Sequence, residues 1–195
     1  MNNNTPLKRL EIWLAEEKLS GAPNPCQAVL ATATTEAIPH ARVVAIREFS
    51  PQGLIFFTQK GTRKVEEIIK NPQGVITFWL ELKQRQIVIE GKIEALTLAE
   101  NDNYWRAYPK EAQIRFTAYA PTSGQPIPSK QFLENKRNDI ASAYTDKELS
   151  MSPYYCGFRL IPHRFVFYAY CSPELSDVWE YQYQANEWLE KTLSP

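Results

Sequence analysis

Five short runs rich in Val, Ile, Phe and Thr crowd into residues 27–96, and this density of strand-like segments most limits the fold. Short polar or Gly/Pro segments separate the runs, as turns separate the strands of a sheet. Ser50-Pro51-Gln52-Gly53 is typical of a tight turn, which would pair the two strands around it antiparallel. The predicted strands are Gln27–Thr34, His40–Phe49, Leu54–Gln59, Gly74–Leu80 and Gln84–Leu96.

Helical patterns flank these strands. Residues 6–19 repeat Leu and Trp near the helical period, which predicts an amphipathic helix. A shorter helix is expected after Thr62, its N-cap, with Val65, Ile68 and Ile69 facing inward and Asn71-Pro72 ending it. The remaining predictions are helices over Leu98–Tyr108 and Ile127–Tyr144, and strands over Tyr155–Leu160, Arg164–Cys171, Trp179–Gln184 and Glu187–Leu193.

Many short antiparallel strands with few helices favour a mainly β fold, a small closed barrel with helices packed outside it. A chain of 195 residues with 44% hydrophobic content can bury one substantial core, so we expect a single domain over residues 1–195. Within it, residues 1–23 form an N-terminal helix and linker, and residues 98–150 form a helical excursion.

Charge and cysteine content narrow the functional classes. Lys plus Arg equals Asp plus Glu at 22 each, so no global field attracts nucleic acid or an acidic membrane, and any anion site must be local. Three cysteines without a C-x-x-C pair and two distant histidines do not favour a metal site. Without a readable signal peptide or a membrane-length apolar run, a cytoplasmic location is the default expectation.

Cations and hydroxyls gather in residues 42–64, at strand ends and at the start of the short helix. Such a set is typical of a phosphate site. Arg42 and Arg47 are an odd number of residues apart, so in a regular strand they face opposite sides and only Arg42 is expected on the phosphate. The alternative is that both arginines are ordinary outward residues and that Gly61-Thr62-Arg63-Lys64 is a plain helix cap followed by solvated cations.

Four blocks in order resemble the FMN-binding blocks of the pyridoxamine 5′-phosphate oxidase family. They are Arg42-Val-Val-Ala-Ile-Arg47, Phe56-Phe-Thr58, Gly61-Thr-Arg-Lys64 and Arg85-Gln-Ile-Val-Ile-Glu-Gly91. The resemblance runs from about Asn24-Pro25 to the C-terminus and so covers nearly the whole chain. It implies a homodimeric, antiparallel split β-barrel with FMN in the groove between subunits.

The resemblance also implies roles for individual residues. Arg42, Arg63 and Lys64 would hold the FMN phosphate, with help from Thr62. Arg47 stands where the family usually has a lysine that touches flavin or substrate, and Tyr168 stands where a tryptophan usually packs near the cofactor. The full set of expected cofactor-binding residues is Arg42, Val43, Arg47, Phe57, Thr58, Thr62, Arg63, Lys64, Gln86 and Tyr168. Gln86, Tyr104 and Tyr168 could equally be ordinary strand or core residues.

The substrate half departs from the family. Tyr104 matches the substrate-phosphate tyrosine, and with Arg47 it completes the expected substrate contacts. The family's remaining arginine, serine, Arg-x-His and flavin-arginine positions are occupied here by Tyr108, Ala112, Glu174, Ser176 and Val178. No Arg, Lys or His occurs from Phe165 to Glu190, so a shifted alignment does not restore them. Compensating cations could come from Arg106, Lys110 or Arg115.

The sequence thus leaves three hypotheses. The first is an FMN-dependent oxidase of pyridoxamine or pyridoxine 5′-phosphate, which passes hydride to flavin and then electrons to oxygen. The second keeps FMN and the fold but changes the substrate, as in phenazine-pathway relatives. The third is a flavin-binding protein without enzymatic activity. In the first two the flavin carries the chemistry and no catalytic side chain is named.

Overall fold

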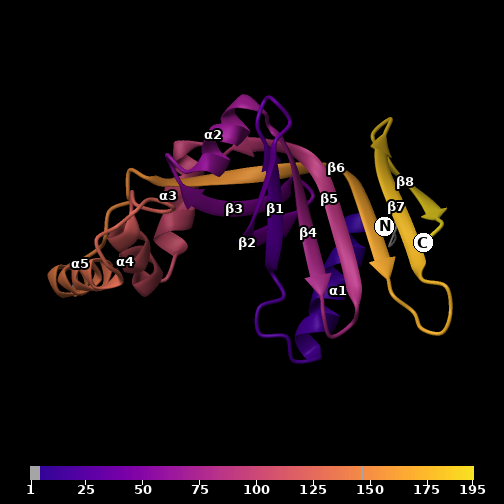
Figure 1. Ribbon diagram of the computed structural model, residues 1–195, viewed down its shortest axis with the longest axis horizontal. Coiled ribbons are helices and arrows are strands. Elements are labelled where there is room, and N and C mark those ends of the chain that lie inside the picture. The colour runs from indigo at the N-terminus through magenta and orange to yellow at the C-terminus, as the bar shows by residue number, and fades with distance from the viewer. Residues whose placement is uncertain (1–4, 146) are drawn as a thin grey trace. The chain divides into compact units, whose positions relative to one another are not determined.

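The computed structural model describes residues 5–145 and 147–195, which form eight strands and five helices (Figure 1). The order along the chain is α1 (Pro6–Leu19), β1 (Gln27–Ala33), β2 (Pro39–Ser50), β3 (Gly53–Gln59), α2 (Arg63–Lys70), β4 (Gln73–Leu80), β5 (Arg85–Ala95), α3 (Leu98–Ala107), α4 (Lys110–Tyr119), α5 (Lys130–Ala143), β6 (Tyr155–Ala169), β7 (Asp177–Gln184) and β8 (Glu187–Leu193).

The strands form one sheet that closes on itself. Their order is β3-β2-β1-β4-β5-β6-β7-β8, and an additional pairing of β3 with β6 closes the first six into a barrel. The pairings of β1 with β2 and β4, of β2 with β3, of β4 with β5, and of β7 with β6 and β8 are all antiparallel. The predicted antiparallel barrel with flanking helices is therefore confirmed.

Alternation of burial along the strands explains why they form a barrel. On β1, Ala28, Leu30 and Thr32 are buried while the residues between them are more exposed. On β5, Ile87 and Ile89 alternate with half-buried neighbours in the same way. Side chains on a strand point alternately to its two faces, so these residues line one apolar interior.

Two glycines let β6 approach the other strands closely. A Cβ added at Gly91 on β5 would overlap the backbone carbonyl of Ile161, and one at Gly53 on β3 would overlap that of Leu160. Gly53 also has a φ of +134°, which side-chain-bearing residues rarely adopt. Only glycine fits at both positions, so the barrel closes where these residues stand.

The chain divides into two compact units. The first contains residues 1–57, 67–94 and 158–195, and the second contains residues 58–66 and 95–157. In the first unit, Trp13 of α1 meets Phe167 and Trp179 edge-on, and the Arg9 guanidinium lies 4.5 Å from the Trp179 ring centroid. These contacts fix α1 against β6 and β7.

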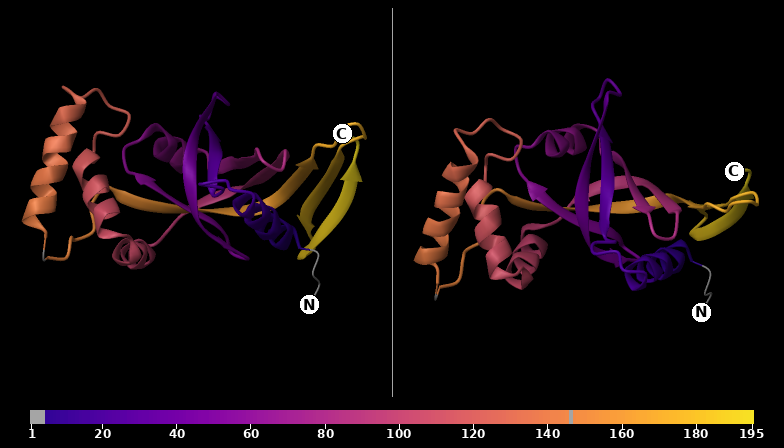
Figure 2. Two further views of the ribbon diagram at one scale, coloured as in Figure 1. Left: turned by 90° about the horizontal axis from the view of Figure 1, so that it is seen from below. Right: turned by 60° about the horizontal axis from the view of Figure 1, so that its bottom comes forward.

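The second unit has its own aromatic core. Trp105 of α3 is almost fully buried, packs against Phe116 and Tyr155, and donates a hydrogen bond from Nε1 to the Leu149 carbonyl at 2.8 Å. Two further views show α4 and α5 side by side (Figure 2). The helical excursion expected over residues 98–150 makes up most of this unit.

Three sequence predictions about secondary structure were wrong. The two predicted strands over residues 155–171 form one strand, β6. Pro162 does not interrupt it because β6 pairs with β7 only from Arg164 onward, so Pro162 needs no N–H donor on that side. Helix α4 was not predicted, and Ile69, expected to face inward, is 73% exposed while Val65 and Ile68 are buried. One residue turns a helix by about 100°, which carries Ile69 away from Ile68.

Two kinds of feature are absent from the described part of the chain. None of its helices is long and apolar enough to cross a membrane. Residues 5–145 and 147–195 also bring together no group of three or more His, Cys, Asp or Glu that could hold a metal ion.

The close approach of β6 predicts different effects for alanine at two paired glycines. Gly91 and Gly74 are register partners, but a Cβ at Gly74 would meet mainly the end of the Ile93 side chain, which can move. We expect Gly91→Ala to lower the free energy of unfolding by about 1–3 kcal/mol, because a backbone carbonyl must shift. Gly74→Ala should be milder. Chemical denaturation of both variants checks the order, and an equal or reversed effect would contradict it.

An ion-pair network across three strands predicts a pH dependence. Arg164 of β6 donates from Nε to Glu180 of β7 at 2.6 Å and also pairs with Glu90 of β5. The hydrogen bond from Arg164 lowers the pKa of the buried Glu180 carboxyl against the opposing effect of burial. A carboxyl whose pKa is lowered by folding stabilises the fold at pH values above its pKa in the unfolded chain. This stabilisation is lost as the pH falls through the pKa of the folded protein.

Wild-type protein should therefore lose more stability than Glu180→Gln when the pH falls from about 5.5 to about 3.5. Urea denaturation at several pH values measures this difference. Parallel pH profiles for the two proteins would show that the Glu180 carboxyl contributes no acid-sensitive stability.

Candidate functional site

The predicted phosphate segment spans β2, β3 and the start of α2. Lys64 donates from Nζ to the hydroxyls of Thr58 at 3.1 Å and of Thr62 at 3.5 Å. Thr62 is buried, its hydroxyl donates to the Gln59 carbonyl at 2.8 Å, and its own carbonyl accepts from the Glu66 amide. Thr62 thus immediately precedes α2, at the N-cap position predicted from the sequence, and the second unit brings Thr58, Thr62 and Lys64 together beside the exposed Arg63.

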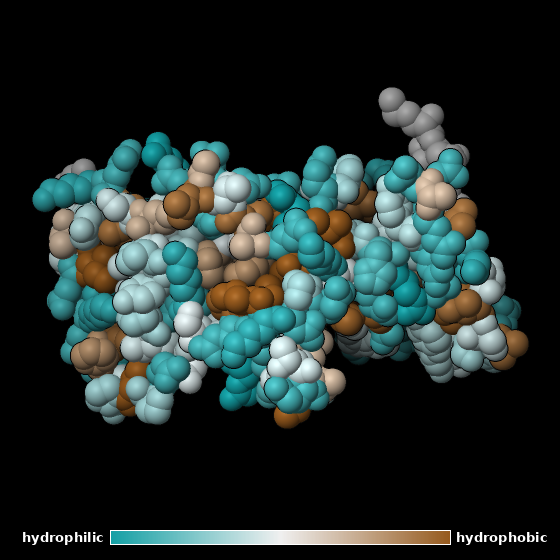
Figure 3. All heavy atoms as spheres, turned by 90° about the horizontal axis from the view of Figure 1, so that it is seen from above, coloured by the Kyte–Doolittle hydropathy of each residue, from teal (hydrophilic) through white to brown (hydrophobic). Residues whose placement is uncertain are grey.

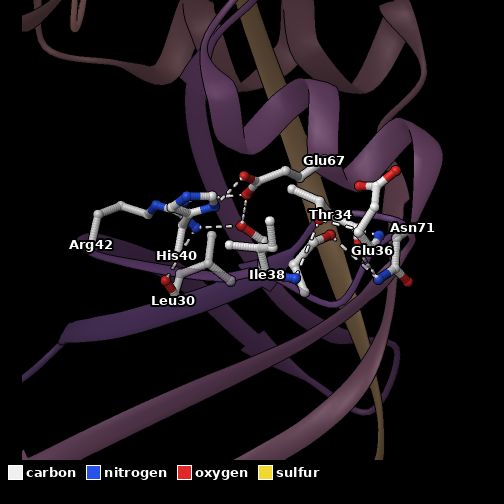
Figure 4. Close-up of polar contacts among 10 residues, drawn as sticks. Leu30, Thr34, Glu36, Ile38, His40, Arg42, Glu67 and Asn71 are labelled. Atoms are coloured by element: carbon white, nitrogen blue, oxygen red, sulfur yellow. Dashed lines mark hydrogen bonds and ion pairs between the residues drawn. The ribbon is translucent and has the colours of Figure 1, made fainter.

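Arg42 belongs to the first unit, where its guanidinium is held by three acceptors (Figure 4). Nη1 donates to the Thr32 hydroxyl at 2.6 Å and to the Leu30 carbonyl at 3.3 Å. Nη2 donates to Glu67 Oε2 at 3.4 Å. Because a guanidinium is planar and rigid, contacts through both terminal nitrogens fix its orientation.

Glu67 completes this cluster, and sequence reasoning missed it. Its side chain is only 5% exposed, and Oε1 lies 2.6 Å from His40 Nδ1. Burial alone would raise the pKa of the Glu67 carboxyl, but the hydrogen bond from Thr32 and the interactions with His40 and Arg42 hold it below its ordinary value. The sequence signal was an acidic residue immediately before the inward-facing Ile68 of α2, where an apolar residue would be usual.

Arg47 lies apart from Arg42. It is exposed, whereas Arg42 shares its side of β2 with the buried Ile46, and the register between β2 and β3 shifts at this point. This difference in exposure agrees with the opposite facing expected from their odd spacing. Arg47 lines a depression of about 280 Å³ together with residues of the segment before β1 and with Lys18.

The remaining predicted cofactor residues are distributed over several strands. Val43 on β2 is 64% exposed, Phe57 on β3 is half-buried, and Gln86 on β5 stands opposite Trp79 of β4. Tyr168 on β6 shares a hydrogen bond of 2.9 Å with the Ser176 hydroxyl. That contact gives Tyr168 a structural partner within its own unit.

Glu174, Ser176 and Val178, which the family resemblance puts at two substrate positions and one flavin position, have different surroundings in the first unit. The Ser176 hydroxyl also accepts from the Cys171 amide at 3.4 Å, so it holds the turn before β7. Val178 is buried and Glu174 is exposed. None of these three side chains offers a phosphate a cation.

The second unit contains the other expected substrate residues. Tyr104 is half-buried on α3, and Tyr108 lies at the end of this helix. A depression of about 590 Å³ is lined by residues that include Tyr108, Arg106 and Lys110. Arg106 pairs with Asp102 at 2.8 Å and Lys110 donates to the Thr145 carbonyl at 2.8 Å, so two of the candidate compensating cations already have partners.

Comparison with known proteins identifies a family. The family model described as pyridoxamine 5′-phosphate oxidase matches residues 15–142. A pyridoxine/pyridoxamine 5′-phosphate oxidase of Microcystis aeruginosa is 33% identical over 184 residues, which cover 94% of this chain and 85% of the relative. A pyridoxine-5′-phosphate oxidase of Dictyostelium discoideum is 32% identical over 198 residues, which cover 98% of this chain and 85% of the relative.

Solved structures show the same fold. PhzG of Burkholderia lata 383, in complex with tetrahydrophenazine-1-carboxylic acid, is 26% identical with a TM-score of 0.86, covering 97% of this chain and 92% of that one. A pyridoxamine 5′-phosphate oxidase-related, FMN binding protein of Nostoc punctiforme is 18% identical with a TM-score of 0.79, covering 98% of this chain and 99% of that one.

Proposed function

Because the chain belongs to the pyridoxamine 5′-phosphate oxidase family, we propose that it binds FMN and acts as an FMN-dependent oxidase. The observation that carries this proposal is the set of hydroxyl and ammonium groups at the start of α2, where Lys64 meets Thr58 and Thr62. Bound FMN would accept hydride from a substrate carbon and pass the electrons to oxygen. The residues of this chain would bind and orient the reactants.

The donor set suits a phosphomonoester. Such a group carries a charge of about −1.5 to −2 near neutral pH. Each hydrogen bond to a charged group contributes roughly 1.5–3 kcal/mol, so Arg63 and Lys64, with Arg42, would anchor the phosphate. A chain whose total charge is balanced needs such a local concentration of cations to bind an anion.

The other predicted residues would contact the rest of the cofactor. Phe57 and Thr58 would lie along the ribityl chain and ring, and Gln86 would hydrogen-bond the flavin. Arg47 would contact flavin or substrate, and its exposure at the depression beside β2 supports this part of the proposal. Val43 and Tyr168 remain cofactor contacts proposed from the family resemblance, as Tyr104 remains a proposed substrate contact.

A homodimer with FMN at the subunit interface is part of this proposal. Val43, Val29 and Trp79 lie on the neighbouring strands β2, β1 and β4 and are 64%, 40% and 53% exposed. Val29 and Val43 are direct register partners, so they form a continuous apolar surface. Apolar side chains also interrupt the hydrophilic surface on the face drawn in Figure 3.

A cytoplasmic location stays a prediction from the sequence.

The substrate is the point at which a second candidate function arises. Glu174 stands where the family has an arginine, and a unit charge about 4 Å from another contributes on the order of 4 kcal/mol at an effective dielectric near 20. Reversing its sign would strongly disfavour a substrate phosphate. We therefore keep an FMN-dependent oxidase or reductase of a different substrate as the alternative, and a flavin-binding protein without activity as the third possibility.

Two observations separate these functions. Purified protein should be yellow or should take up added FMN, and a colourless protein that fails to do so would end the proposal. Anaerobic mixing with pyridoxamine 5′-phosphate then tests the substrate, because turnover bleaches the flavin. Unbleached flavin would favour the alternative substrate, and photoreduced flavin that reoxidises slowly in air would argue against any oxidase.

The phosphate site predicts the effect of two substitutions. We expect Arg63→Ala and Lys64→Ala each to weaken FMN binding about tenfold or more, because each removes a charged hydrogen bond to the phosphate. Titration of the apoprotein with FMN gives the dissociation constants, with quenching of flavin fluorescence as the signal for binding. Lys70→Ala, at the other end of the same helix, is the control and should bind as wild type. Wild-type retention in both test variants would refute the site.

A further inference from the structure

We propose that Glu67 is a positioning residue that holds the Arg42 guanidinium in the orientation needed to grip the FMN phosphate. This inference rests on the proposed function. Glu67 is an anion and would not itself contact a phosphate, so any favourable effect on FMN must act through the cation that it touches. Neither the family resemblance nor the predicted phosphate set includes it.

The Glu67 carboxylate contacts two strands of the first unit, to which Glu67 itself belongs. Both of its oxygens are used: Oε1 lies against His40 Nδ1, and Oε2 accepts from Thr32 of β1 and from Arg42 of β2. Figure 4 shows the Glu67 side chain directed from α2 toward His40 and Arg42. With partners on both oxygens, the carboxylate has little freedom to rotate.

Thr32 makes the arrangement cooperative. Its hydroxyl accepts from Arg42 Nη1 at 2.6 Å and donates its single proton to Glu67. Arg42 Nη2 in turn donates to the same carboxylate oxygen, which closes a ring of three side chains. The Leu30 carbonyl adds a fixed backbone acceptor on Nη1. The plane of the guanidinium is therefore set by groups that are themselves buried or constrained.

Burying an acid at this position lowers the stability of the fold unless polar partners compensate for the lost water. Taking a carboxylate out of water is unfavourable, and an apolar residue of similar volume often serves stability as well or better. Next to the apolar Ile68, an apolar residue would satisfy the packing of α2. Unlike an apolar residue, the carboxylate fixes the orientation of the Arg42 guanidinium.

Charge and position predict opposite effects for removal of the carboxylate. Glu67→Gln removes a negative charge near the proposed phosphate, and by charge alone FMN should bind more tightly. If Glu67 instead positions Arg42, FMN should bind more weakly despite the lost repulsion. Whether Glu67→Gln weakens or tightens FMN binding therefore decides between the two explanations.

The experiment compares FMN with riboflavin, which lacks the phosphate. Apoprotein is titrated with each flavin and binding is followed by fluorescence quenching. We expect Glu67→Gln to weaken FMN binding about tenfold and to leave riboflavin binding unchanged. Thr32→Val removes the bridging hydroxyl and keeps the side-chain volume. It should also weaken FMN binding without changing riboflavin binding, and it provides the test if Glu67→Gln does not fold.

Two carboxylates supply matched controls. Glu66→Gln changes the exposed neighbour on α2, and Glu180→Gln removes another buried, arginine-paired carboxylate. Neither should alter the ratio of the FMN and riboflavin affinities. Equal weakening of both flavins by Glu67→Gln would mean a general structural role, and unchanged or tighter FMN binding would mean that Glu67 does not position Arg42; each result overturns the proposal.

Substitution of Arg42 separates this proposal from the proposed function. Arg42→Ala should weaken FMN selectively, and adding Glu67→Gln to it should cause no further loss, because the residue on which Glu67 acts is gone. A full additional loss would overturn the positioning role. FMN affinity unchanged by Arg42→Ala would instead refute Arg42 as a phosphate ligand, and the positioning proposal would fall with it.

Discussion

The pairing of β3 with β6 is the interaction on which the barrel depends, since it joins the first and last of six strands and leaves no open edge between them. It is possible because Gly53 and Gly91 carry no Cβ where β6 passes. Strands β2 and β3, which bear several of the proposed cofactor residues, are part of this closed barrel. A rigid antiparallel scaffold therefore supports side chains that a flexible hairpin would not hold in fixed positions.

The total charge of the chain is balanced, but cationic side chains are concentrated locally and are held by neighbouring groups. Lys64 is joined to two threonine hydroxyls, and Arg42 is joined to a buried carboxylate and a threonine. Such contacts fix the directions of cationic groups before any ligand arrives, which lowers the entropy lost on binding. By contrast, the stretch from Phe165 to Glu190 contains no Arg, Lys or His, and its Tyr168 and Ser176 hydrogen-bond to each other. The predicted cofactor residues thus include several cations, whereas this stretch offers none.

Much of the fold was predictable because strand signals are local. The turn at Ser50–Gly53 and the alternating burial of β1 follow from a few neighbouring residues. Prediction failed where a distant partner decides the outcome. Two strands were predicted where β6 runs unbroken through Pro162, which the extent of the neighbouring strand β7 permits. Ile69 was expected to face inward with Val65 and Ile68, but it lies on the exposed side of α2.

For the candidate site, the sequence by itself determined which residue types stand together between residues 42 and 64, and hence that a phosphate was the ligand to expect. It also determined that Arg42 and Arg47 face different ways, because side chains alternate along a strand. Only the tertiary structure decided what holds Arg42, since Thr32 and Glu67 lie 10 and 25 residues away along the chain. Contacts over such separations depend on strand register and helix placement, which no local pattern encodes.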